Sequence, residues 1–339
     1  MLRFAITKLI NKENLTEKEM IQAMNIIMDG NAANSQIGSF LTALRMKGET
    51  IDEITGGAKV MRSKALKVDI EDEYAVDPVG TGGDGANTFN ISTLVAIISA
   101  AAGVKVLKHG NRSVSSKCGS ADVLESLGVN IELDPDKVKK CVDVVNIGFM
   151  FAPRFHSAMK NVVIPRRELG IRTIFNILGP LTNPAMAKNQ LLGVFDEELN
   201  ELMAGVLKNL GSRRSMVVHG LDGLDEITIT TKTKVSEIRD NKISTYYLDP
   251  KEYGFKLGKS EDLIGGYPKE NAEIILNILK GEKGAKRDIA LLNAGAAIYV
   301  GGKVDSLASG INQARITLDK GLALKKLNQF IDISQELAT

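Results

Sequence analysis

Apolar residues recur at helical intervals through the first seventy residues of the chain. Helices are predicted at about residues 16–30, 35–48 and from residue 50 onward. The first and third open on pairs with capping-box spacing, Thr16 with Glu19 and Thr50 with Glu53. Methionines line the apolar side of the first helix, which is more typical of core or subunit-interface packing than of a cofactor site. The pattern predicts a small all-helical unit.

The pattern changes at about residue 72, where short apolar runs begin to alternate with helical segments. Strands are predicted at 74–79, 103–107, 129–131, 215–219 and 227–231, and helices at 94–102, 121–127 and through the tail at 286–330. This alternation is typical of a mostly parallel sheet with helices on both faces. The predicted fold class is therefore α/β, with a small all-helical domain attached to a larger α/β domain.

Prolines and glycines interrupt the alternation at residues 165–184, around a helical segment at 169–178. We interpret this stretch as a return of the chain to the helical unit, which predicts a cleft at the junction. The domain prediction pairs residues 1–71 with about 166–190, and residues 72–165 with 191–339.

Composition narrows the class of protein. The chain has 339 residues, of which 44% are apolar and 25% charged, as in soluble enzymes of two domains. A net charge of +2 and an absence of tryptophan weigh against a nucleic-acid-binding surface. The longest apolar stretch, 94–104, is too short to cross a membrane. Cys118 and Cys141 have no metal-binding spacing, and no signal peptide is evident. We therefore expect a cytoplasmic protein.

A glycine-rich loop, GTGGDGANTFNIST at residues 80–93, lies between a predicted strand and a helix. Glycines let the backbone approach an anion, and the first N–H groups of the helix can bind it. Gly80, Gly82 and Gly85 also fit the dinucleotide-binding pattern. That pattern needs an acidic residue about 20 positions later, where this chain has the basic run 108–112. A phosphate site is favoured over an NAD site, and a purely structural turn is the alternative.

A second polar loop, residues 108–120, also follows a predicted strand and precedes a helix. It carries Lys108, Arg112 and Lys117 together with four serines. Because both loops leave parallel strands, we expect them at one edge of the sheet, where together they could hold two phosphate groups. The alternative is a solvated basic loop.

Carboxylates follow the strand predicted at 215–219, in the segment GLDGLDE of residues 220–226. Asp225 and Glu226 beside a phosphate site suit Mg²⁺, which prefers oxygen ligands and commonly keeps waters and substrate phosphates in its shell. A surface turn rich in Asp and Gly is the alternative.

Arg166 and Arg167 lie at the expected domain junction and are candidates for binding an organic acid, since a guanidinium pairs with a carboxylate bidentately. The alternative is that they face solvent. The histidines, His109, His156 and His219, show no metal spacing and are interpreted as structural.

Together these motifs resemble those of the anthranilate phosphoribosyltransferase family. The resemblance rests on GTGGD at 80–84, NIST at 90–93, KHGNR at 108–112, SSK at 115–117, GSAD at 119–122, RTIFNILGPLTNP at 172–184, LDE at 224–226 and LNAGAA at 292–297. It covers essentially the whole chain, and such long ordered motifs are far more specific than a single glycine pattern. One departure is Ser157, where the family often has proline after the histidine.

The resemblance implies a fold of the nucleoside phosphorylase type, shared with class II phosphoribosyltransferases, and a homodimer formed through the helical part. It implies transfer of the phosphoribosyl group of phosphoribosyl pyrophosphate (PRPP) to the amine of anthranilate, in tryptophan biosynthesis, with Mg²⁺ as cofactor. Nucleic acids and membranes are not expected partners.

The resemblance also implies residue roles. The expected PRPP contacts are Gly80, Gly83, Asp84, Thr88, Asn90, Ile91, Ser92, Thr93, Lys108, His109, Gly110, Asn111, Arg112, Ser113, Val114, Ser115, Ser116 and Ser120. The expected anthranilate contacts are Gly80, Asn111 and Arg166, and the expected Mg²⁺ ligands are Ser92, Asp225 and Glu226. No side chain stands out as a general base, so Lys108 and the metal are expected to stabilise charge on the leaving group.

Two other functions are the alternatives to this transfer. A pyrimidine nucleoside phosphorylase of the same fold would need one phosphate pocket, and the Asp225–Glu226 pair counts against it. A nucleic-acid-binding relative without activity is disfavoured by the near-neutral charge and the intact polar loops.

Overall fold

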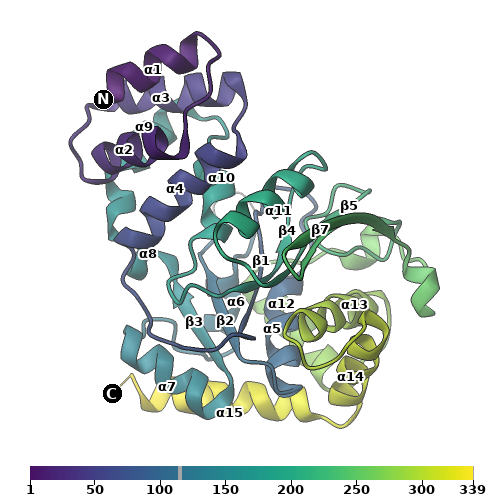
Figure 1. Ribbon diagram of the computed structural model, residues 1–339. Coiled ribbons are helices and arrows are strands. Elements are labelled where there is room, and N and C mark those ends of the chain that lie inside the picture. Colours follow the sequence, from purple (N-terminus) through teal and green to yellow (C-terminus); the bar gives the residue numbers. More distant parts are fainter. Residues whose placement is uncertain (114–116, 339) are drawn as a thin grey trace.

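The structure, a computed structural model, describes residues 1–113 and 117–338, and it divides into a helical unit and an α/β unit (Figure 1). The helical unit contains α1 (Leu2–Ile10), α2 (Glu17–Met28), α3 (Asn34–Lys47) and α4 (Ile51–Lys64). Two later helices, α9 (Lys160–Leu169) and α10 (Phe175–Leu178), pack against α2, α3 and α4.

Both predicted capping boxes are present. The Thr16 hydroxyl accepts the Glu19 N–H, and the Glu19 carboxylate accepts the Thr16 N–H. Thr50 and Glu53 repeat the arrangement. The intervening helix starts at Asn34, one residue before the predicted start at Ser35. The methionines of α2 are buried in the helical core, as their spacing predicted.

The α/β unit is built on one seven-stranded sheet in the order β3-β2-β1-β4-β5-β6-β7. Its strands are β1 (Val76–Gly80), β2 (Val106–Gly110), β3 (Ile147–Phe151), β4 (Asn189–Gly193), β5 (Arg214–Gly220), β6 (Thr233–Arg239) and β7 (Lys242–Leu248). The strands from β3 to β5 pair in parallel, whereas β6 and β7 are antiparallel. Because β1 lies between β2 and β4, the chain order reverses there, and ligands of open α/β sheets bind outside the strand ends at such a point.

Nine further helices and several short 3₁₀ turns complete the described part of the α/β unit. The helices are α5 (Ile91–Ala101), α6 (Ser120–Ser126), α7 (Pro135–Val145), α8 (Ala152–Phe155), α11 (Leu199–Asn209), α12 (Pro268–Leu279), α13 (Ala285–Val300), α14 (Leu307–Asp319) and α15 (Leu322–Glu336). Helix α5 is apolar on nearly every side because it packs against the sheet, α13 and α15. Across the residues that are described, none of the helices has the length and apolar character to cross a membrane.

The two units share part of their apolar packing. Ile174, Phe175 and Leu178 of the 165–184 stretch are buried with the residues of α2 to α4. Leu192 of β4 and Val217 of β5 belong to the same cluster. The helical unit is therefore joined to the sheet by continuous side-chain packing.

Several predicted elements are wrong. Residues 129–131 and 227–231 form no strand. The alternating apolar side chains are buried at both places. The backbone N–H groups there bind side chains instead of a neighbouring strand: that of Asn130 donates to Ser334 Oγ, and that of Ile227 donates to Asn293 Oδ1. The helix predicted at 169–178 is broken, because α9 ends at Leu169, Gly170 after it adopts φ 63°, and α10 begins only at Phe175.

Strand β2 begins at Val106, three residues later than predicted, and includes Lys108, His109 and Gly110. The side chains of Lys108 and His109 are thus fixed by the sheet rather than carried on a loop.

Candidate active site

The glycine-rich loop and the acidic segment meet at the carboxyl ends of β1 and β4. The Gly82 N–H donates to Asp225 Oδ2 over 2.7 Å. A Cβ atom on Gly80 would lie 2.5 Å from that oxygen, and one on Gly193 would lie 1.6 Å from the Asp225 backbone oxygen. Glycine is therefore required at both strand ends so that the acidic segment can approach.

Asp225 and Glu226 are half-buried carboxyl groups in an acidic environment. Burial raises the pKa of Asp225, and the charges of Asp84 and Glu226 raise it further. Burial and Asp84 also raise the pKa of Glu226, to about 8, although Lys108 and the Ser92 amide act in the opposite direction. Burial and neighbouring carboxylates thus disfavour the ionised forms of this pair, and a bound cation would stabilise them.

Asn293 of α13 fixes the position of the acidic segment. Its Oδ1 accepts the Ile227 N–H at 2.9 Å, and its Nδ2 donates to the Ile227 carbonyl at 2.7 Å. Asn293 is fully buried. Sequence reasoning assigned it no role, because nothing local indicates that α13 reaches the end of β5.

Lys108 provides positive charge that acts on Glu226. Its Nζ donates to the Pro78 carbonyl at 2.8 Å and to Ser92 Oγ at 3.2 Å. Burial lowers the pKa of Lys108, whereas Asp77 and Glu226 act to raise it. The ammonium group thus connects the middle of β1 with the start of α5, and Glu226 acts on it electrostatically.

His109 points into the protein interior. Its Nδ1 lies 2.5 Å from Asp77 Oδ2, and its Nε2 lies 2.8 Å from the Gly179 carbonyl oxygen. Although burial lowers the pKa of His109, the charge of Asp77 and both hydrogen bonds raise it, and the net shift is upward. The ring joins β1 and β2 to the 179–183 segment, so a PRPP contact from this residue would come from its backbone.

The second loop is closed by Asp122, whose carboxylate accepts the N–H groups of Ser113 and Gly119. The Arg112 guanidinium pairs with Asp122 and with Glu125, and the Asn111 side chain accepts the Arg112 N–H. Gly110 is needed because a Cβ there would meet Ser120 Oγ at 2.1 Å. The predicted contacts Val114, Ser115 and Ser116 lie outside the described residues.

The start of α5 lies between the two loops, and two of its first backbone donors have partners: the Ile91 N–H donates to the Phe89 carbonyl and the Ser92 N–H to the Glu226 carboxylate. Ile91, Ser92 and Thr93 form its first turn, and Asn90, at the N-cap position, makes no side-chain cap. An uncapped helix N-terminus favours an anion. Residue 88 is held beside this turn by a β-bridge to Ile264.

Two arginines approach from the helical side. Arg166 is half-buried in the last turn of α9, with its guanidinium 5.2 Å from the centre of the Phe175 ring. Burial lowers the pKa of Arg166, and no ion pair of Arg166 is found within the described ranges. Arg172 lies over the Phe195 ring and donates to the carbonyl of Gly83 in the glycine-rich loop. Arg172 is part of a recognised motif, but sequence reasoning gave it no contact with this loop.

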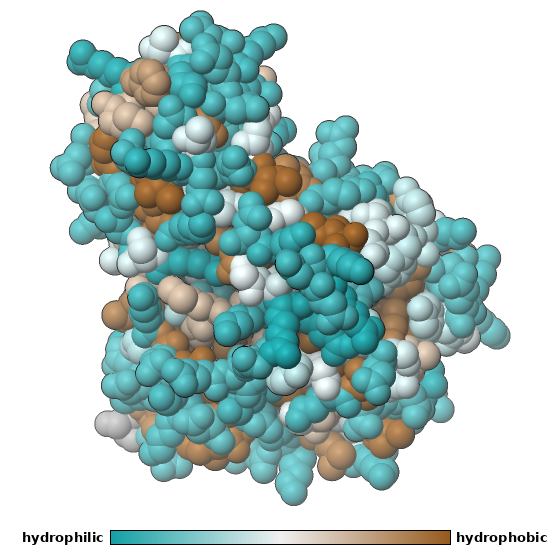
Figure 2. Space-filling view, viewed as in Figure 1, coloured by the Kyte–Doolittle hydropathy of each residue, from teal (hydrophilic) through white to brown (hydrophobic). Residues whose placement is uncertain are grey.

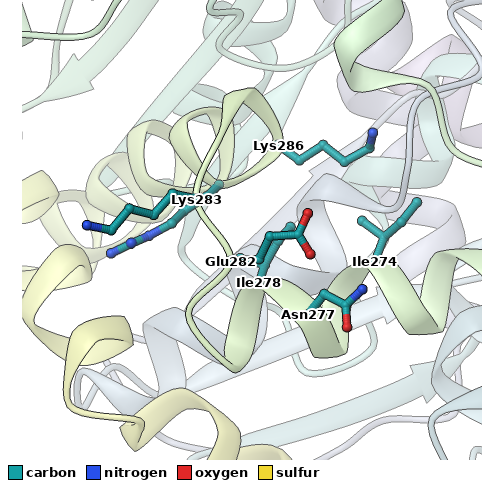
Figure 3. Close-up of a pocket in the computed structure, with 7 residues that line it drawn as sticks. Ile274, Asn277, Ile278, Glu282, Lys283 and Lys286 are labelled. Carbon is teal, nitrogen blue, oxygen red and sulfur yellow. The ribbon is translucent and has the colours of Figure 1, made fainter.

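A separate hollow of about 90 Å³ lies between the end of α12 and the start of α13 (Figure 3). It is well below the roughly 300 Å³ of ordinary ligand pockets. The Lys286 ammonium donates to the Asp262 carbonyl and Arg287 pairs with Asp319, so two of its cations already have partners. It contains none of the predicted site residues.

Comparisons with known proteins agree with this geometry. The model of the glycosyl transferase family a/b domain matches residues 72–324, and that of the family's helical bundle domain matches residues 4–65. An anthranilate phosphoribosyltransferase of Alkaliphilus metalliredigens is 64% identical over 99% of both chains. The chain belongs to the anthranilate phosphoribosyltransferase family.

Solved structures of anthranilate phosphoribosyltransferases superpose on this chain over nearly its full length. That of the Thermus thermophilus enzyme is 42% identical, has a TM-score of 0.93, and covers 98% of this chain and 99% of its own. The Saccharomyces cerevisiae enzyme in complex with PRPP and Mg is 30% identical, with a TM-score of 0.91 and coverage of 99% and 98%. The predicted fold class is confirmed, and the relatives support a transferase rather than a nucleoside phosphorylase.

Proposed function

We propose that this chain transfers the phosphoribosyl group of PRPP to the amine of anthranilate, releasing pyrophosphate, as its family does. The observation that carries the proposal is the contact of Asp225 with the Gly80–Gly82 turn, together with the hydrogen bond from the Ser92 N–H at the start of α5 to the Glu226 carboxylate. The turn and the helix suit the phosphates of PRPP. Arg166, at the end of α9, is proposed to pair with the anthranilate carboxylate.

The residues fit a Mg²⁺ ion bound together with PRPP. No three His, Cys, Asp or Glu side chains of the described residues converge on a metal site. Asp225, Glu226 and the Ser92 hydroxyl would therefore share the ion with waters and substrate phosphates, as Mg²⁺ sites commonly do. Bound there, Mg²⁺ would neutralise charge on the departing pyrophosphate. Lys108, beside Ser92, would add to that stabilisation.

The direct test mixes PRPP, Mg²⁺ and anthranilate with the purified protein and follows the loss of anthranilate fluorescence. Turnover that requires all three components supports the proposal. Parallel reactions with pyrimidine nucleosides and phosphate test the phosphorylase alternative. Turnover only in those reactions would overturn the assignment.

The affinity for Mg²⁺ is expected to rise with pH up to about 8 and then to level off. The Glu226 carboxyl, whose pKa is raised to about 8, must lose its proton to bind the cation. Because binding displaces one proton, the affinity for Mg²⁺ falls by up to about tenfold for each unit that the pH drops below this pKa. Mg²⁺ titrations between pH 6 and 9 in the presence of PRPP measure the slope. Glu226→Gln controls for ionisation of PRPP, and equal slopes in both proteins would contradict the assignment.

Arg166→Ala is expected to raise the KM for anthranilate by about tenfold or more and to leave the KM for PRPP within about twofold. The physical reason is the loss of a charge-assisted hydrogen bond to the substrate carboxylate. Steady-state kinetics with each substrate varied in turn give both constants. Arg167→Ala is the neighbouring control. An effect confined to PRPP would show that the two subsites are reversed.

We also propose that two chains pair through the helical unit. Apolar side chains are exposed there, including Phe4 at 52%, Ile10 at 67% and Met46 at 82%, and Figure 2 shows apolar patches on one face of this unit. Light scattering measures the molecular mass in solution, and a mass of two chains would support the pairing. Cys118 and Cys141 are buried thiols that form no disulfide, which fits a reducing, cytoplasmic location.

A further inference from the structure

Helix α12 contributes a buried amide, Asn271, that the proposed function leaves without a role. Asn271 is 1% exposed and lies in the first turn of the helix. Its Oδ1 accepts the Gly266 N–H at 2.7 Å, and its Nδ2 donates to Asn90 Oδ1 at 2.9 Å. Helices α12, α6 and α5 come together in this part of the fold (Figure 1).

Hydrogen bonds to both the oxygen and the nitrogen of the Asn90 side-chain amide fix its orientation. Its Oδ1 receives the hydrogen bond from Asn271, and its Nδ2 donates to the Cys118 carbonyl at 3.2 Å. An asparagine at the N-cap position ordinarily accepts the N–H of the second or third helical residue. Here those residues are Ser92 and Thr93, and Asn90 caps neither of them.

The same amide connects the segments that carry the predicted PRPP contacts. Asn271 binds Gly266 within the strap 263–267, and the strap pairs with the glycine-rich loop. The Phe89 N–H donates to the Leu263 carbonyl, and the Gly265 N–H donates to the Asn87 carbonyl. Through Asn90, Asn271 also reaches Cys118 at the end of the second loop.

We propose that Asn271 is a positioning residue that keeps the Asn90 side chain off the first turn of α5 and so leaves the Thr93 N–H to the phosphate groups of the substrate. By holding the Asn90 amide toward Cys118, it prevents that side chain from capping the helix and competing with the ligand. The effect on PRPP rests on the proposed function; the effect on Asn90 does not.

Asn271→Ala is expected to raise the KM for PRPP about tenfold, the equivalent of one hydrogen bond, with kcat within about twofold. Asn271→Asp keeps the acceptor for Gly266 and loses the donor to Asn90, so the same rise in the KM for PRPP is expected. This variant replaces Asn271→Ala if the alanine variant folds poorly. Asn200→Ala is the matched control. Like Asn271, Asn200 is a buried side-chain amide, and its Nδ2 donates to backbone carbonyls of β5 and β6. It is expected to lower stability and leave the KM for PRPP unchanged.

A double-mutant cycle with Asn90→Ala tests whether Asn271 acts through Asn90. The double variant is expected to have the same KM for PRPP as Asn90→Ala alone. Fold-changes that multiply, or a loss confined to kcat, would overturn the proposal.

Hydrogen exchange provides a readout that requires no substrate. In Asn271→Ala the freed Asn90 side chain caps α5 at its third residue, and the Thr93 amide is expected to exchange more slowly than in the wild type. The slowing is lost in the double variant. Unchanged exchange refutes the inference, whereas a wild type without PRPP turnover refutes only the proposed function.

Discussion

Replacing Asp225 by Asn and Glu226 by Gln together is expected to lower kcat/KM by ~1000-fold or more. The two carboxylates are the proposed ligands of a cation whose stabilisation of leaving-group charge is worth several kcal/mol, and about 1.4 kcal/mol corresponds to tenfold in rate. Steady-state rates measured over a range of Mg²⁺ concentrations give the loss. Saturating Mg²⁺ is not expected to restore the rate.

Folding of this double variant is expected to be preserved. Burial favours the neutral forms of both carboxyl groups. Neutral side chains of the same shape therefore remove the free-energy cost of burying two negative charges in the protein without Mg²⁺. Circular dichroism and thermal melting without Mg²⁺ check this. Asp222→Asn, in the same turn but bonded to Thr228, is the neighbouring control. Wild-type rates in the double variant would refute the metal assignment.

Gly193→Ala is the second substitution expected to have a large effect, a loss of activity of ~100-fold or more. The added Cβ would lie 1.6 Å from the Asp225 backbone oxygen, so the acidic segment must shift by more than 1 Å, and misplacement of this size costs about 100-fold. Gly193 itself is not among the expected substrate contacts. The measurement is kcat/KM together with the affinity for Mg²⁺, and both should fall.

Gly38→Ala on α3 is the control for adding a methyl group. Nothing lies within 4 Å of the Cβ that it would add, and alanine favours a helix more than glycine. Its activity should be unchanged and its stability slightly higher. If Gly193→Ala binds Mg²⁺ like the wild type, the close approach of the acidic segment is not what assembles the site.

The sequence predicted the parts of this molecule that depend on short-range patterns. Capping boxes involve residues three positions apart, and the glycine-rich loop is recognised from its own composition beside an apolar helix. The two polar loops were expected at one sheet edge because parallel strands end together, and the hydrogen bond from Asn90 Nδ2 to the Cys118 carbonyl agrees with that expectation.

What the sequence could not predict are partners distant in the chain. Arg172 reaches Gly83, and Asn293 holds Ile227, through a tertiary fold that no local pattern specifies. The interior position of the His109 ring was missed for a related reason. The predicted strand ended three residues too early, and alternation along a strand decides which face a side chain takes. The domain boundaries and the roles of the individual site residues stay predictions.

The apolar packing that Leu178 shares with Leu192 and Val217 has a consequence for how the chain melts. Neither the bundle nor the sheet keeps a complete interior once the other is removed. Heating should therefore disrupt both in one cooperative transition, and fragments cut near residue 70 should be insoluble unless they are produced together.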